Sequence, residues 1–299
     1  MMKKASILSL LTLGMAATAA EEAFHHNLPD SGLLPSYTSI SAISRMGERH
    51  GGSDLSLQSA KLTIPLSDPR KSGWNGMMLN IQLDAEATFI NTGGNLELKH
   101  GEVYFVAVPV SVISPMGNGN KLTLGAAPTL AADSGAVEHG LDCLLYGMYT
   151  IKRSDTFSYT VGVAASPRFA EHVLVPIIGF EWQATPEWLI RMKGYRAEAL
   201  YKVNDRFSVG PFIAGEGGTW SVETEAGDRQ FRVRSLVLGV TGEYNFAEPG
   251  QTKRIITFSL GSTVATSAEF TERGEGKHAY ETHHYEPGLF ISAGVDFRF

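Results

Sequence analysis

Strict alternation of apolar and polar residues over long stretches is the feature that most constrains this chain. Between residues 77 and 89, every odd position is apolar and most even positions are polar. The polar positions are Asn80, Gln82, Asp84, Glu86 and Thr88. Because successive side chains of a β-strand point to opposite faces of its sheet, this stretch predicts a strand with one apolar face and one polar face.

The same period of two returns over residues 157–165, 236–246 and 256–264. The second face of these stretches is mostly small or polar, and it includes Thr241 and Glu243. After the first twenty residues, no run reaches the roughly 18 consecutive apolar residues that a membrane helix needs, and apolar residues at helical spacing are hard to find. The chain is therefore predicted to be all-β.

The length of these alternations separates two ways of burying a sheet. Strands of a soluble sandwich are about five or six residues long and face their bulky apolar residues inward. Strands of a transmembrane β-barrel need about 9–11 residues, with an apolar outer face against lipid and a lumen that can be polar. The longest alternation here covers residues 77–89. Together with short, turn-forming links, this pattern predicts a single antiparallel up-and-down transmembrane barrel surrounded by membrane lipids.

Counting the runs gives thirteen strands, which conflicts with the even number found in bacterial single-chain barrels. Either the stretch 187–204 turns near Gly194 and forms two strands, giving fourteen, or one weaker run is not a strand, giving twelve. An even number places both termini on the periplasmic side. Short links then face the periplasm, and the longer polar links 222–229 and 272–284 face outward.

The beginning of the chain has the pattern of a secretory signal peptide over residues 1–19, in which Ala17 and Ala19 supply the small residues of a cleavage site. Cleavage is expected to leave a flexible segment over residues 20–34 and one barrel domain over residues 35–299. It also removes two lysines, so that 23 basic side chains face 31 acidic ones. This acidic balance disfavours nucleic acid as a partner.

The final strand carries a second terminal pattern. Its apolar positions alternate up to the last residue and are Ile291, Ala293, Val295, Phe297 and Phe299. The intervening Asp296 and Arg298 are predicted to face the lumen. A closing strand that ends in an aromatic residue resembles the terminal signal of outer-membrane barrels. Together with the signal peptide, this resemblance implies recognition by the barrel assembly machinery and a place in the outer membrane of a Gram-negative bacterium.

Residues 55–299 also resemble an uncharacterised family of outer-membrane barrels that is defined only as a domain of unknown function. The segments that carry the resemblance are Tyr159-Thr160-Val161-Gly162-Val163, Val175-Pro176-Ile177-Ile178-Gly179-Phe180-Glu181-Trp182, Trp188-Leu189-Ile190 and Ala199-Leu200-Tyr201. The family usually places a proline between the last two segments, where this chain has Gly194-Tyr195. The resemblance implies a barrel and supplies no substrate.

Patterns for catalysis and metal binding are weak. The nine histidines are scattered, and adjacent histidines on a strand point to opposite faces, so no metal or cofactor site is predicted. The single Cys143 stands among apolar neighbours, which favours a buried side chain over a nucleophile. Ser166 and His172 are the nearest pairing that a hydrolase could use. No sequence feature makes them converge, and the chain is not expected to be an enzyme.

The predicted lumen leaves three functions open. The residues predicted to line it are Asn80, Gln82, Asp84, Glu86, Thr241, Glu243, Asp296 and Arg298. A polar lining suits a narrow passive channel for small solutes. Alternatively, these groups pair across the lumen with cations such as Arg191, Lys193 and Lys202, giving a closed structural or surface-interaction barrel. The third function is an interfacial lipid or peptide hydrolase. The sequence favours the channel and names no solute.

Overall fold

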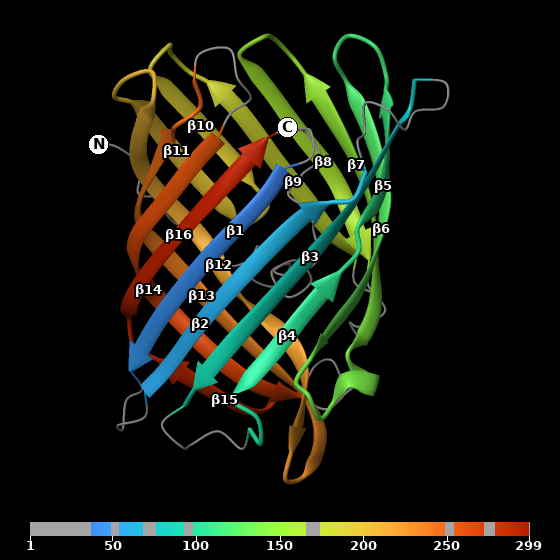
Figure 1. Ribbon diagram of the computed structural model, residues 1–299, viewed down its shortest axis with the longest axis vertical. Helices are drawn as coiled ribbons and strands as arrows, with labels where there is room; N and C mark the ends of the chain where they lie inside the picture. The colour runs from blue at the N-terminus through green and yellow to red at the C-terminus, as the bar shows by residue number, and fades with distance from the viewer. Residues whose placement is uncertain are drawn as a thin grey trace, which may run out of the picture.

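The computed structural model describes residues 37–48, 54–67, 76–92, 98–165, 174–248, 254–271 and 279–298 (Figure 1). Side chains are described for these residues except at positions 37–48, 54, 279–281 and 298. The predicted signal peptide with Ala17 and Ala19, the segment 20–34 and the terminal Phe299 lie outside the described residues.

Sixteen β-strands and one turn of 3-10 helix make up the regular structure of the described residues. In chain order these are β1 (Tyr37–Glu48), β2 (Asp54–Pro65), β3 (Met78–Asn91), β4 (Glu102–Ala107), β5 (Val110–Pro115), β6 (Lys121–Ala132), η1 (Val137–His139), β7 (Leu141–Lys152), β8 (Phe157–Ala165), β9 (Leu174–Gln183), β10 (Trp188–Lys193), β11 (Arg196–Lys202), β12 (Phe207–Thr224), β13 (Gly227–Asn245), β14 (Arg254–Thr271), β15 (Ala279–Tyr285) and β16 (Gly288–Arg298). No helix in this part of the chain has the length and apolarity needed to cross a membrane. The prediction of an all-β chain is confirmed.

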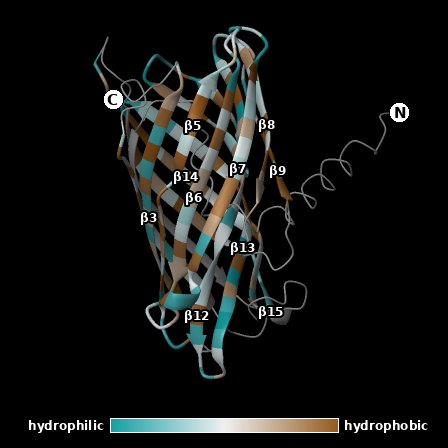
Figure 2. Ribbon diagram, turned by 90° about the vertical axis from the view of Figure 1, so that its right-hand side faces the viewer, coloured by the Kyte–Doolittle hydropathy of each residue, from teal (hydrophilic) through white to brown (hydrophobic). Residues whose placement is uncertain are grey.

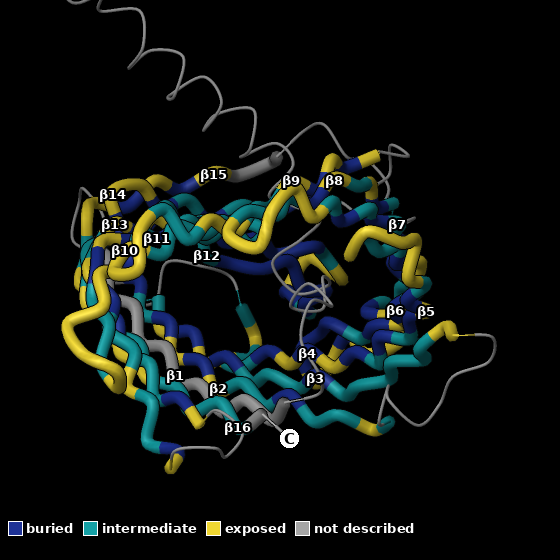
Figure 3. The backbone as a smooth tube through the Cα atoms, turned by 90° about the horizontal axis from the view of Figure 1, so that it is seen from above, coloured by how far each residue is buried: buried dark blue, intermediate teal, exposed yellow. Residues whose placement is uncertain are grey.

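The strands belong to one sheet that closes on itself. β1 pairs with β2 on one side and with β16 on the other, and β13 pairs with both β12 and β14. Neighbouring strands run antiparallel, and a single parallel contact joins β12 to β6. Seen from one end, the strands form a ring (Figure 3). The predicted closed β-barrel is confirmed.

The structure has sixteen strands where the sequence predicts twelve to fourteen, and prolines explain part of the difference. β4 and β5 both lie between β3 and β6, and their register on β3 continues from Asp84 opposite Ala107 to Ile81 opposite Val110. They are separated at Pro109, which has no N–H to donate to the ladder. β15 and β16 likewise follow one another along β14 and are separated at Pro287.

The stretch 187–204 consists of two strands. β10 and β11 form an antiparallel hairpin of six and seven residues. Gly194 lies in the turn with φ +55°, a backbone conformation that glycine adopts without steric cost. Both strands are much shorter than β12, and this difference in length shapes the interior of the barrel.

The predicted long link over residues 222–229 is wrong. β12 continues to Thr224 and β13 begins at Gly227, so only a tight turn joins them. The Thr224 hydroxyl donates to the Gly227 carbonyl at 2.7 Å, and Gly227 has φ +111°. The polar residues of this segment are thus strand residues whose backbone groups pair across the hairpin. In the second predicted link, 272–284, strand β15 begins at Ala279.

The outer face of the barrel is apolar. On β13, Leu238 and Val240 are 44% and 52% exposed, whereas the neighbouring Thr241 is 1% exposed. The same exposed phase of large apolar side chains occurs on strands all around the wall, and Figure 2 shows the resulting hydrophobic bands. Large apolar side chains exposed on strand after strand are typical of a surface that faces a membrane. The alternation of residues 236–246 therefore follows the burial pattern that the sequence predicts.

One end of the barrel is filled by an apolar core. Pairing of β11 with β12 ends at Ala214, and β12 and β13 extend beyond it. This extension reaches the opposite wall, where Ser221 of β12 pairs with Ala132 of β6. Its large side chains are buried against one another, with the rings of Trp220 and Phe231 at 6.3 Å. The other members of the core come from β2, β3, β4, β6, β14 and β15. The extension therefore plugs this end of the barrel.

Candidate functional site

A network of buried charges lies on the inner face of the barrel. The Arg191 guanidinium on β10 donates hydrogen bonds to Glu198 on β11 and to Glu243 on β13. β10 and β13 are separated by two other strands, so a contact between them must cross the interior surface. The side chains of Arg191, Glu198 and Glu243 are 15%, 5% and 19% exposed. Charged groups this far from solvent need partners, and each of the three has at least one.

Arg196 extends this network toward β14. Its Nε donates to the Oε2 atom of Glu198 at 2.9 Å, and its Nη2 donates to the Ser259 hydroxyl at 3.2 Å. The guanidinium also stands 4.2 Å from the centroid of the Phe212 ring, a cation–π contact. Phe212 in turn packs against Phe290 with ring centroids 6.0 Å apart. These contacts connect six neighbouring strands of the barrel, β10, β11, β12, β13, β14 and β16, on its inner face.

The balance of charge in the network is even. Two guanidinium groups, on Arg191 and Arg196, face two carboxylates, on Glu198 and Glu243. Removing one member would leave an unpaired charge in a poorly solvated place, at a cost of about 3–5 kcal/mol for a fully buried group. The four side chains therefore act as a unit.

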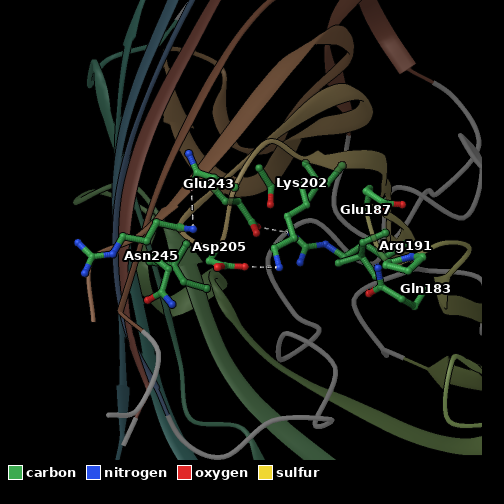
Figure 4. A pocket seen from close by; sticks show the side chains of 14 residues that line it. Gln183, Glu187, Arg191, Lys202, Asp205, Glu243 and Asn245 are labelled. Carbon is green, nitrogen blue, oxygen red and sulfur yellow. Dashed lines mark hydrogen bonds and ion pairs between the residues drawn. The ribbon is translucent and has the colours of Figure 1, made fainter. Parts of the chain in front are cut away.

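A cavity of about 420 Å³ opens beside the network. Figure 4 shows its lining, to which the strands β9 to β14 and the turns before β10 and after β11 contribute. The polar and charged residues of the lining are Gln183, Glu187, Arg191, Lys202, Asn204, Asp205, Arg206, Ser208, Glu243 and Asn245. Apolar surface comes from Leu189, Leu200, Ile255 and Pro186. The cavity joins the network to the end of the barrel where β11 and β12 are linked, and we call it the vestibule.

The rim of the vestibule carries a further ion pair. Lys202 lies 2.7 Å from the Oδ1 atom of Asp205, and the hydrogen bond between them holds the pKa of Asp205 below its ordinary value. Both groups are well exposed. The pair adds no net charge to the rim at neutral pH.

The residues predicted to line the lumen fall into separate groups. Asp84 on β3 is buried and accepts hydrogen bonds from the Thr63 hydroxyl at 2.6 Å and from Gln82 Nε2 at 3.1 Å. The Thr88 hydroxyl donates to Glu86 at 3.2 Å, and Asn80 stands opposite Ser111 of β5. β3 and β13 lie in different parts of the wall, so this group is not brought together with Glu243.

The second group lies on β13 and β16. Glu243 is part of the Arg191 network, and Thr241 accepts a hydrogen bond from Ser259 at 2.9 Å, next to Arg196. Asp296 stands opposite Ile255 of β14. The side chain of Arg298 lies outside the described residues.

The sequence predicts that Arg191 and Lys202 pair with charged groups across the lumen. Arg191 does contact Glu243 across the inner face, whereas Lys202 pairs with Asp205 in the turn that follows its own strand. Sequence reasoning missed Glu198, Arg196 and Phe212 as parts of the site. The alternation of residues 196–202 would have placed Arg196 and Glu198 on one face, and no local signal points to Phe212.

In the terminal pattern, more and less exposed residues alternate from Leu289 to Gly294, and Val295, Asp296 and Phe297 are all partly buried. Ile291 is exposed on the outer face, and the ring of Phe297 meets Phe246 edge-on at 6.0 Å. Ala293 and Val295 share the phase of these residues on β16. Recognition of this pattern by an assembly machinery stays a prediction, and its last residue, Phe299, lies outside the described residues.

The described residues hold no hydrolase pair or metal site of the kinds considered from the sequence. Ser166 and His172 lie outside the described residues. Among the residues that the structure describes, no three His, Cys, Asp or Glu side chains gather as a metal site, and Cys143 is a free, half-buried thiol.

Comparison with known families gives one match. Residues 37–298 match the family described as Domain of unknown function (DUF6268). The chain belongs to this family. The match covers every described strand, so the resemblance that the sequence shows to an uncharacterised barrel family is confirmed. No curated protein matches the chain.

Several solved barrels resemble this member of the family at low sequence identity. An outer-membrane channel from Pseudomonas putida F1 is 10% identical, with a TM-score of 0.48, and the match covers 92% of this chain and 98% of that one. The KdgM porin is 8% identical, with a TM-score of 0.35 and coverage of 87% and 99%. The NanC porin is 10% identical, with a TM-score of 0.38 and coverage of 88% and 100%.

Proposed function

We propose that the protein is an outer-membrane barrel that acts as a narrow passive channel for small solutes. The observation that carries this proposal is the Arg191 network, which is buried inside a barrel whose outer face is apolar. Buried ion pairs are weak contributors to stability, and well-packed apolar residues of similar size often serve a core as well or better. Because Arg191 and Glu243 also line the vestibule, this set of charged side chains is better explained by a role beside a solute path than by stability alone.

The arrangement of the ends supports a periplasmic position for both termini. Tyr37 of β1 stands opposite Arg298 of β16, so the described chain begins and ends at the same end of the barrel. Short turns at 153–156, 184–187 and 203–206 lie at that end as well. Short turns are typical of the periplasmic side of such barrels. Counting each proline-interrupted pair once gives fourteen strand positions, the even number that this sidedness requires.

In this proposal, the polar side chains of β3 line another part of the same lumen. Asn80, Gln82, Asp84 and Glu86 share the strand face opposite to the exposed Phe89. Thr241, Asp296 and Arg298 complete the proposed lining. Charged side chains along a pore act on solutes at close range.

The apolar core at the other end favours a second function, a closed structural or surface-interaction barrel without transport. Trp220, Phe231 and Phe270 fill the space between the extension and the opposite wall, and such packing would block solute if it persisted. The channel therefore requires a path beside the core or a movement of the extension.

Planar-bilayer conductance of the refolded barrel tests the proposal. A gel on which the unheated protein migrates differently from the boiled protein establishes folding first. Discrete conductance steps are expected, and the substitution Arg191→Gln should change their size. Arg153→Gln is the matched control, because Arg153 lies in a short turn, 6.0 Å from the ring of Tyr159 and away from the network. A folded barrel without steps would refute the channel and support the closed barrel.

A further inference from the structure

We infer that this channel favours small uncharged solutes that form hydrogen bonds, and does not discriminate between cations and anions. This inference rests on the proposed function and names its substrate class. Its basis is the combination of an electroneutral network with a vestibule that carries the amides of Gln183, Asn204 and Asn245.

The network has no net charge, so it favours neither cations nor anions. Pores that select ions do so with rings of one kind of charge or of one kind of dipole. Here the guanidiniums of Arg191 and Arg196 are held directly against the carboxylates of Glu198 and Glu243. Opposite charges in contact form a neutral pair, and Coulomb attraction of an ion to one partner is largely offset by its repulsion from the other. An approaching ion of either sign therefore meets no excess charge in the network.

The rim repeats this balance. Lys202 is paired with Asp205, so the mouth of the vestibule carries another neutral ion pair. Among the lining residues that remain, Glu187 and Arg206 are also of opposite sign. The vestibule thus holds as many cationic as anionic side chains when Glu198 and Arg196 are counted with it.

The amides of the vestibule present both donors and acceptors. The Oδ1 atoms of Asn204 and Asn245 accept hydrogen bonds from backbone N–H groups, which leaves the donating end of each amide for other contacts. In Gln183 the donating end of the amide is engaged instead, because its Nε2 donates to the carbonyls of Thr185 and Trp188. Its carbonyl end is therefore the acceptor that remains. A solute with several hydroxyl groups can both accept and donate, and matches this mixture.

The size and the apolar surfaces of the vestibule fit the same class. A volume of about 420 Å³ lies within the range of small-molecule sites, which is about 300–1,000 Å³. Leu189, Leu200 and Ile255 supply apolar patches between the polar groups. A compact polyol has apolar C–H faces and a polar rim of hydroxyls, so both kinds of surface find counterparts.

Reversal potentials in a KCl gradient test the charge argument. The wild-type channel is expected to have a cation-to-anion permeability ratio near one. Arg191→Gln leaves the network with one excess negative charge and should raise the ratio at least threefold. Glu243→Gln leaves one excess positive charge and should lower it at least threefold. The double variant restores the balance and should return the ratio to the wild-type value.

Solute flux into proteoliposomes tests the substrate class. We expect sorbitol to enter faster than gluconate, an anion of similar size, and faster than protonated glucosamine, a cation of similar size. A wild-type channel that prefers gluconate or glucosamine, or charge variants that shift the ratio in the same direction, would overturn the inference.

Different results refute the channel and its preference for uncharged solutes. A folded wild-type barrel with neither conductance nor flux refutes the channel itself. A conducting barrel with strong ion selectivity leaves the channel standing and removes only the uncharged solute. If a single variant does not fold, the wild-type permeability ratio and the ranking of the three solutes still decide the question.

Discussion

The plug at one end of the barrel predicts that two phenylalanines on neighbouring strands differ sharply in their contribution to stability. Phe231 on β13 is 0% exposed and lies between Trp220 and Phe270, with ring centroids at 6.3 Å and 5.1 Å. Phe258 on β14 is 56% exposed on the outer face. Truncation of either side chain to alanine loses the favourable free energy of transferring the phenyl ring out of water, which is about 1.5–3 kcal/mol. Only truncation of Phe231 also leaves a cavity in packed protein.

Substitutions of buried phenylalanine by alanine cost about 3–5 kcal/mol in total. We therefore expect Phe231→Ala to lower the free energy of unfolding by about 4 kcal/mol, and Phe258→Ala by about 2 kcal/mol in a lipid bilayer. With a denaturant slope of about 2 kcal/mol per molar urea, the two midpoints should differ by about 1 M. Urea unfolding of the refolded variants, followed by the gel shift between folded and unfolded forms, measures this difference. Equal midpoints would show that the interior is not packed as described.

Three further predictions concern the wall, the rim and the last residue. Gly210→Ala should prevent or strongly impair folding, because the added Cβ would lie 1.7 Å from the backbone carbonyl oxygen of Ala199. The control Gly194→Asn should fold, since asparagine tolerates the positive φ of that turn. A normal gel shift of Gly210→Ala would contradict the close approach of the two strands. The pKa of Asp205 is lowered by Lys202, so the contribution of this pair is fully present above the ordinary carboxylate pKa of about 3.9 and is lost as the pH falls through the lowered value. Asp205→Asn and wild type should therefore differ in ion permeability ratio at pH 7 and at pH 5 and converge only when the pH falls below the ordinary carboxylate pKa, and convergence already at pH 5 would contradict the pairing. Deletion of Phe299 should reduce assembled barrel in the outer membrane while export stays intact, and normal levels of the truncated protein in membrane fractions would remove the assembly role.

The wall of the barrel could be predicted because its signal is local. The alternation of residues 77–89 becomes β3, and the phase that is apolar in the sequence is the phase that includes the exposed Phe89. Gly194 likewise marks a turn by itself, because few other residues adopt its φ without cost. Each of these inferences needs only neighbours along the chain.

The network and the plug could not be predicted because they depend on strands that are far apart in sequence. Arg191 meets Glu243 only when three strand pairings fix the register between β10 and β13. The alternation places Glu243 on the inner face, but it does not say which cation stands level with it. The sequence predicts an outward link at residues 222–229, the tip of the extension, because these residues are polar. The core partners of Trp220 and Phe231 come from other parts of the chain.

The shortness of β10 and β11 connects the two levels of the interior. Pairing of β11 with β12 ends where Arg196 meets Ala214, and the Gly215 N–H donates to the Tyr195 carbonyl at the turn. Beyond that point, β12 has no antiparallel neighbour on this side among the described residues, so its remaining length can cross to β6 and build the plug. The same early turn keeps Arg191 and Arg196 close together, where both reach Glu198. Lengthening this hairpin to the span of a full strand should therefore disturb the neutral network and the plug together, whereas trimming the tip of the β12–β13 extension should disturb the plug alone.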